Sequence, residues 1–438
     1  LQGEVVYEKG INLIDNNVFK PIYQSNAFSY NNQVGFQAEY FKNTKWDGKP
    51  AAVKTINKID FQWGDGEQVA DGVFANEMSI RFTANYTAEK TGEITFELKG
   101  DDRCSLYVDG EKYIETNLKN GYYTLAAEKG KQYKIVIDYM QFSDNAEVKF
   151  DMGIMEKATA QTIAERVKDA DVIIFVGGIS AKLEGEAMPV SIEGFKGGDR
   201  TDIALPAIQT NLLKALKATG KPVVFVNMSG SAMGFEWEKA NIPAIVQAWY
   251  GGQAGGQAVA DILFGDYNPA GRLPITFYKN VSDLPDFEDY SMENRTYRYF
   301  KGDVLYPFGF GLSYTTFQYG NLKIMENKGE VIVTATVTNI GQKDGDEVVQ
   351  LYVSHKNTTE KTAIRALKGF KRIHLNSGES RNISFILDKK NISIVASDGK
   401  SIIPNGLLEI AVGGGQPTNE SLQTKSTVKG NIEIKIFK

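Results

Sequence analysis

Asp171-Val172-Ile173-Ile174-Phe175-Val176-Gly177 is a continuous apolar run near the middle of the chain. It follows a segment with helical periodicity at residues 158–169, and a second helical segment follows at residues 206–219. Two more apolar runs, residues 222–227 and 244–249, continue the alternation of helix and strand. Continuous apolar strands that alternate with helices are typical of a parallel sheet covered on both faces. The central part of the chain is therefore predicted to be an α/β sandwich domain with a mostly parallel sheet.

The regions on either side show short alternating runs and turn signals, which predict all-β domains. The last of these regions, with runs such as Val331–Val337, is typical of an immunoglobulin-like or fibronectin-like sandwich. One strand-like run, Glu4–Glu8, precedes the first β-domain. Parallel strands need a crossover connection, so we expect this run to join the α/β sheet through the helix at 158–169, which makes the first β-domain an insertion. The predicted domains are the first part of the α/β domain (1–34), the inserted β-domain (35–153), the rest of the α/β domain (154–278), a linker (279–316) and the C-terminal sandwich (317–438).

Composition excludes several classes of function. The 54 acidic residues outnumber the 49 basic ones, and no long run of Lys and Arg offers a surface for nucleic acid. No stretch reaches the roughly 18 consecutive apolar residues of a membrane span, and the chain opens without a methionine or a signal segment, so we expect a soluble chain whose true beginning lies upstream. Only His355, His374 and Cys104 are available for Ser-His-Asp, Cys-His or zinc chemistry. Carboxylates are therefore the expected agents of any catalysis.

Ligands of open parallel sheets gather outside the carboxyl ends of the strands. The loop after Gly177 runs from Gly178 to Ala204 and holds five charged candidates: Glu184, Glu186, Glu193, Asp199 and Arg200. In an extended segment Glu184 and Glu186 point to the same side, so two carboxylates can share one site and raise one pKa. A carboxylic acid that stays protonated near neutrality is the general acid of glycoside hydrolysis. The alternative is an acidic surface loop without a catalytic role.

Several segments, taken together in their order and spacing, resemble glycoside hydrolase family 3 over nearly the whole chain. They are Leu183-Glu184-Gly185-Glu186, Gly198-Asp199-Arg200-Thr201, Leu205-Pro206-Ala207-Ile208-Gln209, Trp249–Gly256, Leu263–Pro274, Arg295–Phe300 and Tyr306–Tyr314. The resemblance implies the C-terminal portion of a retaining, exo-acting β-glycosidase of the β-xylosidase or β-glucosidase type, which releases terminal sugars from oligosaccharides without a cofactor. It favours a periplasmic or extracellular location.

The same resemblance assigns roles to residues of the carboxylate loop. It implies Glu186 as the general acid/base, with Glu184 as the second candidate or a substrate contact. The residues from Met188 to Gly198 form a spacer that many relatives lack, and this spacer leaves Glu184 and Glu193 open as alternatives for the acid/base. Asp199 and Arg200 are expected to form a structural ion pair that pins the loop, with substrate contact as the alternative.

The nucleophile of the family is an Asp on a (β/α)₈ barrel that precedes the α/β domain. Retaining hydrolysis needs two carboxyl groups about 5 to 5.5 Å apart, and this chain supplies only the proton donor. We therefore expect a barrel domain, and the first strand and helix of the α/β domain, to lie before Leu1. The 438-residue chain alone is expected to be inactive.

The inserted β-domain resembles PA14, through Ala38-Glu39-Tyr40-Phe41 and Gly100–Gly110. In some family 3 enzymes such an insert lies over the active site and limits the length of the saccharide. Paired Asp residues hold calcium in PA14-like lectins, so Asp101 and Asp102 are candidate calcium ligands. Calcium needs six or more oxygen partners and the sequence offers few, so a polar turn is the alternative.

Other motifs favour structural roles or a different class of protein. Ser229-Gly230-Ser231 imitates a nucleophile elbow, but no histidine lies in the α/β domain. The glycines from Gly251 to Gly256 fit close helix packing better than a phosphate loop, because no Gly-Lys-Ser/Thr follows. A non-catalytic carbohydrate-binding or structural protein is the competing hypothesis. Aromatic residues that either stack on sugars or pack internally are Trp46, Trp63, Tyr297, Tyr299 and Phe300.

Overall fold

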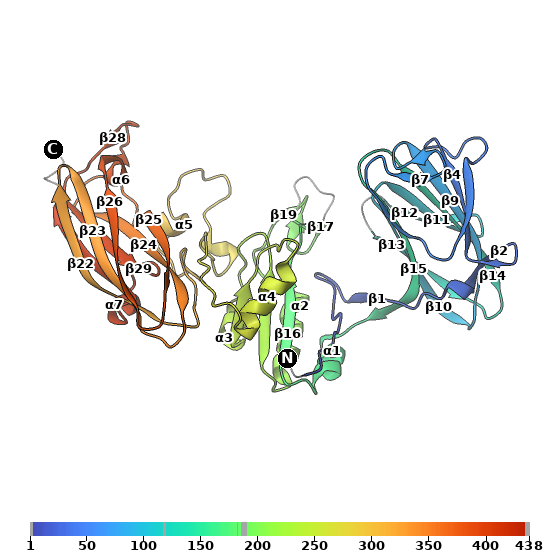
Figure 1. The fold of residues 1–438 in the computed structure, drawn as a ribbon, viewed down its shortest axis with the longest axis horizontal. Coiled ribbons are helices and arrows are strands. Elements are labelled where there is room, and N and C mark those ends of the chain that lie inside the picture. Colours follow the sequence, from blue (N-terminus) through green and yellow to red (C-terminus); the bar gives the residue numbers. More distant parts are fainter. Residues whose placement is uncertain (1–2, 117–119, 182, 185–190, 434–438) are drawn as a thin grey trace. The chain divides into compact units, whose positions relative to one another are not determined.

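The computed structural model describes residues 3–116, 120–181, 183–184 and 191–433. The chain divides into two units, Leu1–Ile163 and Ala164–Lys438. Most sheets are antiparallel, and one three-stranded sheet in the second unit is parallel (Figure 1). In the described ranges, no helix is long and apolar enough to cross a membrane.

The first unit is a sandwich of two antiparallel sheets. The five-stranded sheet contains β1 (Asn17–Pro21), β6 (Asp60–Trp63), β10 (Gly92–Gly100), β13 (Asn120–Ala127) and β15 (Ala146–Lys157). The eight-stranded sheet contains β2 (Phe28–Tyr30), β3 (Gln33–Val34), β4 (Phe36–Phe41), β5 (Ala52–Ile56), β9 (Met78–Thr87), β11 (Arg103–Val108), β12 (Glu111–Thr116) and β14 (Gln132–Gln141). Two short pieces, η1 (Ser25–Ala27) and the hairpin of β7 (Gln68–Ala70) and β8 (Val73–Phe74), complete the unit.

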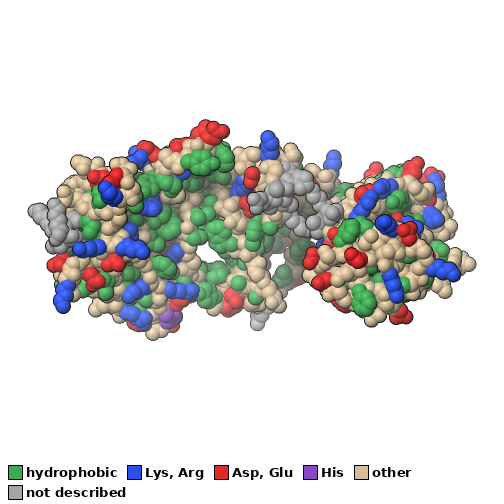
Figure 2. All heavy atoms as spheres, turned by 90° about the horizontal axis from the view of Figure 1, so that it is seen from above, with side chains coloured by type: hydrophobic (Ala, Val, Ile, Leu, Met, Phe, Trp, Pro, Cys, Tyr) green, Lys and Arg blue, Asp and Glu red, His purple; other side chains and the backbone are tan. Residues whose placement is uncertain are grey.

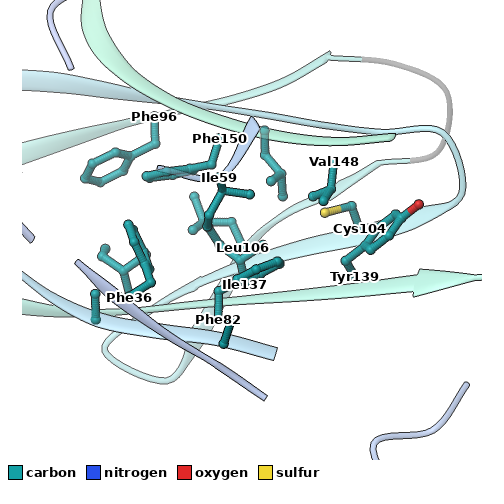
Figure 3. Packing of buried hydrophobic residues seen from close by; sticks show 14 of the residues in the cluster. Phe36, Ile59, Phe82, Phe96, Cys104, Leu106, Ile137, Tyr139, Val148 and Phe150 are labelled. Carbon is teal, nitrogen blue, oxygen red and sulfur yellow. The ribbon is translucent and has the colours of Figure 1, made fainter. Parts of the chain in front are cut away.

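Apolar side chains from the two inner faces fill the space between these sheets (Figure 3). Phe96 and Phe150 stack with ring centroids 5.6 Å apart, and Leu106 and Ile137 face them from the other sheet. All four side chains are fully buried, and each contributes roughly 1.5 to 3 kcal/mol by leaving water. Cys104 lies in the same core, where burial raises the pKa of its thiol. The alternating pattern of the sequence therefore produces a complete core for this unit.

The expectation for the start of the chain is wrong. Glu4–Glu8 forms no strand, and the side chains of Val5 and Tyr7 are 81% and 85% exposed. The first strand is β1, which pairs antiparallel with β15, and β2 and β3 also belong to the sandwich, so the sandwich begins well before residue 35. Strand propensity alone did not hold Glu4–Glu8 in a strand, because propensity mostly reflects packing against a partner strand.

The second unit begins with the alternating α/β region. The three predicted strands are present as β16 (Ile173–Gly178), β20 (Val223–Met228) and β21 (Ala244–Gln247), and they pair in parallel in this order. The predicted helices correspond to α1 (Ala160–Val167), which spans the boundary between the units, and to α2 (Ala207–Ala218) and α4 (Gly255–Phe264); α3 (Glu236–Asn241) was not predicted. A small antiparallel sheet joins two strands of the spacer, β17 (Ser191–Ile192) and β18 (Phe195–Lys196), to β19 (Asp199–Arg200) directly after it.

A close approach of two backbones holds the carboxyl ends of β16 and β20 together. Gly178 has φ +115°, and a Cβ at this position would lie 2.1 Å from the carbonyl oxygen of Met228. The buried Gln209 on α2 receives the Gly178 N–H at 2.7 Å and donates to the Gly178 carbonyl at 2.6 Å. Only glycine fits this conformation without strain, so residue 178 fixes where the following loop starts.

The linker, with η2 (Val281–Asp283) and α5 (Thr296–Tyr299), leads into a second β-sandwich. Its two sheets are formed by β22 (Phe317–Asn327), β23 (Glu330–Asn339) and β26 (Ser380–Leu387), and by β24 (Gly345–Lys356), β25 (Ala366–Leu375), β29 (Leu407–Gly413) and β30 (Thr427–Glu433). The small elements α6 (Lys389–Ile392), β27 (Ile394–Val395), β28 (Ser401–Ile402) and α7 (Asn419–Gln423) follow or connect these strands.

A buried ion pair joins the α/β region to this sandwich. Arg272 donates to Glu347 on β24 at 2.8 Å, and the two side chains are 10% and 2% exposed. The hydroxyl of Tyr319 donates to the other oxygen of Glu347 at 2.8 Å. A buried carboxylate is tolerated only when it is paired and hydrogen-bonded, as here.

Candidate functional site

Glu184 lies where the loops after all three parallel strands meet. It belongs to the loop after β16, Ser231 follows β20, and Tyr250 follows β21. The Ser231 hydroxyl donates to one carboxylate oxygen of Glu184, and the Tyr250 hydroxyl donates to the other at 2.7 Å. The carboxyl edge of the parallel sheet therefore brings a predicted site residue together with partners from two other loops, as expected for an open α/β sheet.

Arg200 on β19 supports this carboxylate through Ser231. Its guanidinium donates to the Ser231 hydroxyl at 3.0 Å and to the carbonyl oxygen of Ala232 at 3.0 Å. Burial lowers the pKa of Arg200, while the negative charge of Glu184 acts in the opposite direction. A guanidinium can only donate, so the hydroxyl of Ser231 accepts from Arg200 and directs its own proton to Glu184.

The expected ion pair between Asp199 and Arg200 is wrong. The two are consecutive residues of β19, and successive side chains of a strand point to opposite faces. Asp199 is exposed, whereas Arg200 is partly buried and turned toward Ser231. Arg200 does pin the loop, but by hydrogen bonds to Ser231 and to backbone carbonyl oxygens, including that of Asp202 at 3.1 Å.

A polar network beneath the site fixes the loop after β20. The buried Asn227 donates to the side chain of Gln247 on β21 at 2.6 Å, and Gln247 donates to the Ser229 hydroxyl at 3.1 Å. Ser229, also buried, donates to the backbone oxygen of Ser231 at 2.9 Å. These hydrogen bonds link the ends of β20 and β21 to the loop that carries Ser231, so the position of Ser231 is set from below.

The backbone at the end of β21 holds Tyr250 in place. Trp249 has φ +57°, a left-handed conformation that is rare for a bulky residue. Its ring packs edge-on against Phe277 at 6.2 Å, while Tyr250 turns toward Glu184. A Cβ on Gly230 would lie 2.6 Å from the Tyr250 ring, so the two residues are in close contact. Burial and the hydrogen bond to Glu184 raise the pKa of Tyr250, which keeps its hydroxyl protonated and able to donate.

The structure describes one of the two other acidic candidates for the acid/base. Glu186, the predicted acid/base, lies outside the described residues. Glu193 lies in the exposed turn between β17 and β18. The structure therefore places Glu184 in the site and Glu193 on the surface.

The calcium hypothesis gains no support from the described geometry. Asp101 accepts hydrogen bonds from the Tyr139 hydroxyl at 2.6 Å and from the backbone N–H of Glu147 at 2.9 Å. Asp102 accepts from the backbone N–H of Phe142 at 2.8 Å. Within the ranges that the structure covers, no group of three or more His, Cys, Asp or Glu side chains could hold a metal ion. These contacts match the alternative, a polar turn.

Neither histidine belongs to the α/β region. His355 lies on β24, and His374 on β25 pairs with Asp346 at 2.7 Å. The hydroxyl of Ser231 instead contacts Glu184 and Arg200. Among the described contacts, the serines of the Ser229-Gly230-Ser231 motif therefore have no histidine partner.

Most of the aromatic candidates for sugar stacking pack internally. Trp46 donates its indole N–H to the carbonyl oxygen of Ile80 at 3.2 Å. Trp63 stacks on Phe61 at 4.9 Å between ring centroids. The remaining ring contacts are Tyr297 on Phe308 at 4.2 Å, Phe300 on Tyr278 at 5.0 Å and the Arg298 guanidinium over Tyr299 at 5.4 Å.

Sequence reasoning missed the partners of Glu184. Ser231 was considered only as a nucleophile, and Tyr250 only as part of a motif. Their position in the sequence could have identified them as partners. Ser231 and Tyr250 both follow the carboxyl ends of predicted parallel strands, as Glu184 does. Asn227 and Gln247 were also detectable, as polar residues at or next to the ends of two otherwise apolar strands.

Charged side chains of both signs lie on the surface of the described residues. On the face shown in Figure 2, acidic and basic side chains of the described residues are interspersed, without a large patch of one sign.

Comparison with known proteins extends these observations. Residues 32–314 match the model of the glycosyl hydrolase family 3 C-terminal domain, and residues 347–416 match the fibronectin type III-like domain. The chain is 38% identical over 398 residues to a xylan 1,4-β-xylosidase from Xylanibacter ruminicola, covering 89% of this chain and 46% of that protein. It is 36% identical over 271 residues to a periplasmic β-glucosidase from Salmonella typhimurium, covering 58% of this chain and 34% of that protein.

A solved structure shows the same fold. The β-glucosidase from Kluyveromyces marxianus in complex with glucose has a TM-score of 0.67 and 24% identity, over 98% of this chain and 52% of that one. The chain thus spans about half the length, or less, of these relatives. The expected fibronectin-like character of the last domain is confirmed. Because the first family model alone matches well over half of the residues, the chain belongs to glycosyl hydrolase family 3.

Proposed function

We propose that this chain supplies the general acid/base of a retaining, exo-acting β-glycosidase of the β-xylosidase or β-glucosidase type. The observation that carries this proposal is the carboxylate loop at the carboxyl edge of the parallel sheet, where Glu184 is held by Ser231 and Tyr250. Relatives named as β-xylosidase and β-glucosidase support the class of reaction. Release of terminal sugars from oligosaccharides is the activity we propose for the whole protein.

The contacts of Glu184 help to distribute the roles of the two neighbouring carboxyl groups. Both of its oxygens accept hydrogen bonds from hydroxyl groups, and Arg200 orients one of these donors. Such a setting suits an ionised carboxylate, which accepts and does not donate. A general acid must instead carry a proton that it can give to the leaving oxygen. We therefore keep Glu186 as the proton donor and assign Glu184 to substrate contact.

The second carboxylate of the retaining pair is proposed to come from outside these 438 residues. In the family it is an Asp on a (β/α)₈ barrel, which forms the covalent glycosyl intermediate while the acid/base later activates water. The chain spans about half of its relatives, which supports a division of the site between two parts of a longer protein. On this proposal the first sandwich is a PA14-like module, and a periplasmic or extracellular location is supported by the periplasmic relative.

Kinetics of the complete encoded protein test the assignment. The substitution Glu186→Ala is expected to lower turnover by about 10²- to 10⁴-fold for substrates with poor leaving groups, and less for activated aryl glycosides. Azide should restore part of the rate. Glu193→Gln is the matched control, because Glu193 lies in an exposed turn, and its rates should equal those of the unmodified protein. Azide rescue in Glu184→Ala rather than in Glu186→Ala would move the role to Glu184.

The competing hypothesis of a non-catalytic carbohydrate-binding protein makes a different prediction. On this hypothesis the complete protein binds saccharide without hydrolysing it. Glu186→Ala then changes neither the binding nor the absence of product. Product formation from aryl β-xylosides or β-glucosides, with loss in Glu186→Ala, would exclude it.

A further inference from the structure

Tyr250 combines three properties that its structural role does not require. The residue is 42% exposed although it lies in the site, its hydroxyl is bound to Glu184, and it follows a residue with left-handed backbone, Trp249. Backbone strain of this kind persists only where the surroundings enforce it, and it concentrates at functional sites. The strain at Trp249 therefore directs attention to what its neighbour presents.

The backbone of Gly230 is one neighbour of the Tyr250 ring. The backbone of Gly230 lies close enough that an added Cβ would come within 2.6 Å of the ring carbon Cε2. The hydroxyl is fixed by Glu184, and few rotamers satisfy both restraints. A rigid, partly exposed aromatic ring loses little conformational entropy when a ligand packs on it.

Glu184 adds polar recognition beside this ring. An ionised carboxylate offers about four acceptor positions, and among the described residues two are used, by Ser231 and Tyr250. The side chain is only partly buried, so further donors can reach it. A pyranose ring matches both features, since it has an apolar C–H face and hydroxyl groups at its rim.

We propose that Tyr250 and Glu184 form a saccharide subsite, in which a pyranose ring stacks on the exposed part of Tyr250 while its hydroxyl groups donate to Glu184. This inference rests on the proposed glycosidase function, to which it adds a residue that contacts the sugar. In a disaccharide of two xylose or two glucose units, both the sugar to be released and the sugar that leaves are pyranose rings. The subsite binds whichever of these two rings lies beside Glu184.

Binding of D-xylose and D-glucose to the complete encoded protein tests the subsite, because neither sugar is consumed even if the enzyme is active. For the sugar that binds, titration calorimetry should show a dissociation constant about tenfold higher in Tyr250→Ala than in the unmodified protein. This change corresponds to a loss of about 1.4 kcal/mol of binding free energy. Tyr250→Phe keeps the ring and should stay within about twofold of the unmodified protein. Gly230→Ala should weaken binding as Tyr250→Ala does, because its methyl group displaces the ring. Tyr267→Ala is the matched control, with a similarly exposed ring bound through its hydroxyl to Arg372, and should not change binding.

Thermal melting shows whether each variant folds. If Tyr250→Ala does not fold, the sugar affinities of Gly230→Ala and Tyr250→Phe test the proposal in its place. Unchanged binding in Tyr250→Ala or Gly230→Ala overturns the proposal. Equal losses in Tyr250→Phe and Tyr250→Ala also overturn it, because they assign the effect to the hydroxyl rather than to the ring. The catalytic assignment is read separately from Glu186→Ala turnover, so either proposal can fail while the other stands.

Discussion

Replacing Arg272 with Met removes the positive partner of a carboxylate that is only 2% exposed, Glu347. The long apolar stem of Met retains much of the packing of the Arg side chain, so the main loss is electrostatic. The hydrogen bond from Tyr319 remains, but the charge of Glu347 is no longer compensated. Breaking a buried ion pair by removing one partner costs about 3 to 5 kcal/mol. We therefore expect Arg272→Met to destabilise the C-terminal sandwich and its junction with the α/β region by this amount.

Hydrogen–deuterium exchange measures the effect where it occurs. A chain with separate hydrophobic cores does not unfold in one step, so a local readout is needed. Amides of β24, which carries Glu347, should exchange faster by about 100-fold or more, since each 1.4 kcal/mol is a factor of about ten. Amides of β10, in the other unit, should exchange at the rate of the unmodified protein and serve as the internal reference.

The pH dependence of this defect has a definite sign. Burial raises the pKa of Glu347, and Arg272 opposes the rise, so the pKa increases further in Arg272→Met. A group whose pKa is higher in the folded state contributes stability below its unfolded pKa, and this stability is lost as pH rises through the folded value. The defect should therefore shrink as the pH is lowered from about 8 toward about 5, because Glu347 then takes up a proton.

Two further variants separate charge from packing. Arg272→Met with Glu347→Gln should recover much of the loss, because a neutral amide can still accept from Tyr319. Lys361→Met removes an exposed ion pair with Glu293 and should change stability by less than about 1 kcal/mol. Exchange of β24 that is unchanged in Arg272→Met, or a defect that grows on acidification, would refute the reasoning.

Four other outcomes follow from the described packing and from the proposed division of the site. Phe150→Ala should cost about 3 to 5 kcal/mol in urea unfolding of the first unit, whereas Phe142→Ala, at an exposed position, should cost less than about 0.5 kcal/mol. Gly178→Ala should lower the melting temperature and the yield of folded protein, because the new Cβ would overlap the carbonyl oxygen of Met228 at a residue with positive φ. The thiol of Cys104 should resist labelling by a disulfide reagent at about pH 8 until the protein is unfolded, because burial raises its pKa. The 438-residue chain should release no product from aryl β-xylosides that the complete encoded protein hydrolyses, and measurable turnover would contradict the external nucleophile.

Much of the fold could be predicted because the periodicity of the sequence and the local signals agree. Pro206 and Gly220 bracket a helix predicted at residues 206–219, and α2 spans Ala207–Ala218. Gly220 has φ +79°, the left-handed conformation that commonly ends a helix. The run at Glu4–Glu8 has similar strand propensity to other edge strands, yet forms none. Propensity selects a strand only when a partner is available, and the sequence pattern does not contain that information.

The candidate site was only partly predictable, for a different reason. The rule that ligands gather at the carboxyl edge of a parallel sheet directed attention to the loop after β16, where the structure places Glu184, because the rule depends on topology alone. The partners Ser231 and Tyr250 depend on how two other loops turn. The turn at Trp249 uses a backbone conformation that sequence patterns do not suggest for tryptophan. The same limit explains the wrong ion pair, since Arg200 turned to the loop after β20 rather than to its sequence neighbour.

The geometry around Glu184 also changes how the acidic loop is interpreted. Sequence spacing treats Glu184 and Glu186 as equivalent carboxyl groups on one side of an extended segment. The Ser231 and Tyr250 hydroxyl groups both donate to Glu184, and Arg200 orients the first of them, so the described contacts fix the position of Glu184 at the carboxyl edge of the sheet. On the proposed assignment, a carboxylate held in this way binds the substrate, while Glu186 gives the proton. The turnover of Glu184→Ala and Glu186→Ala, each measured with and without azide, decides between this assignment and the reverse one.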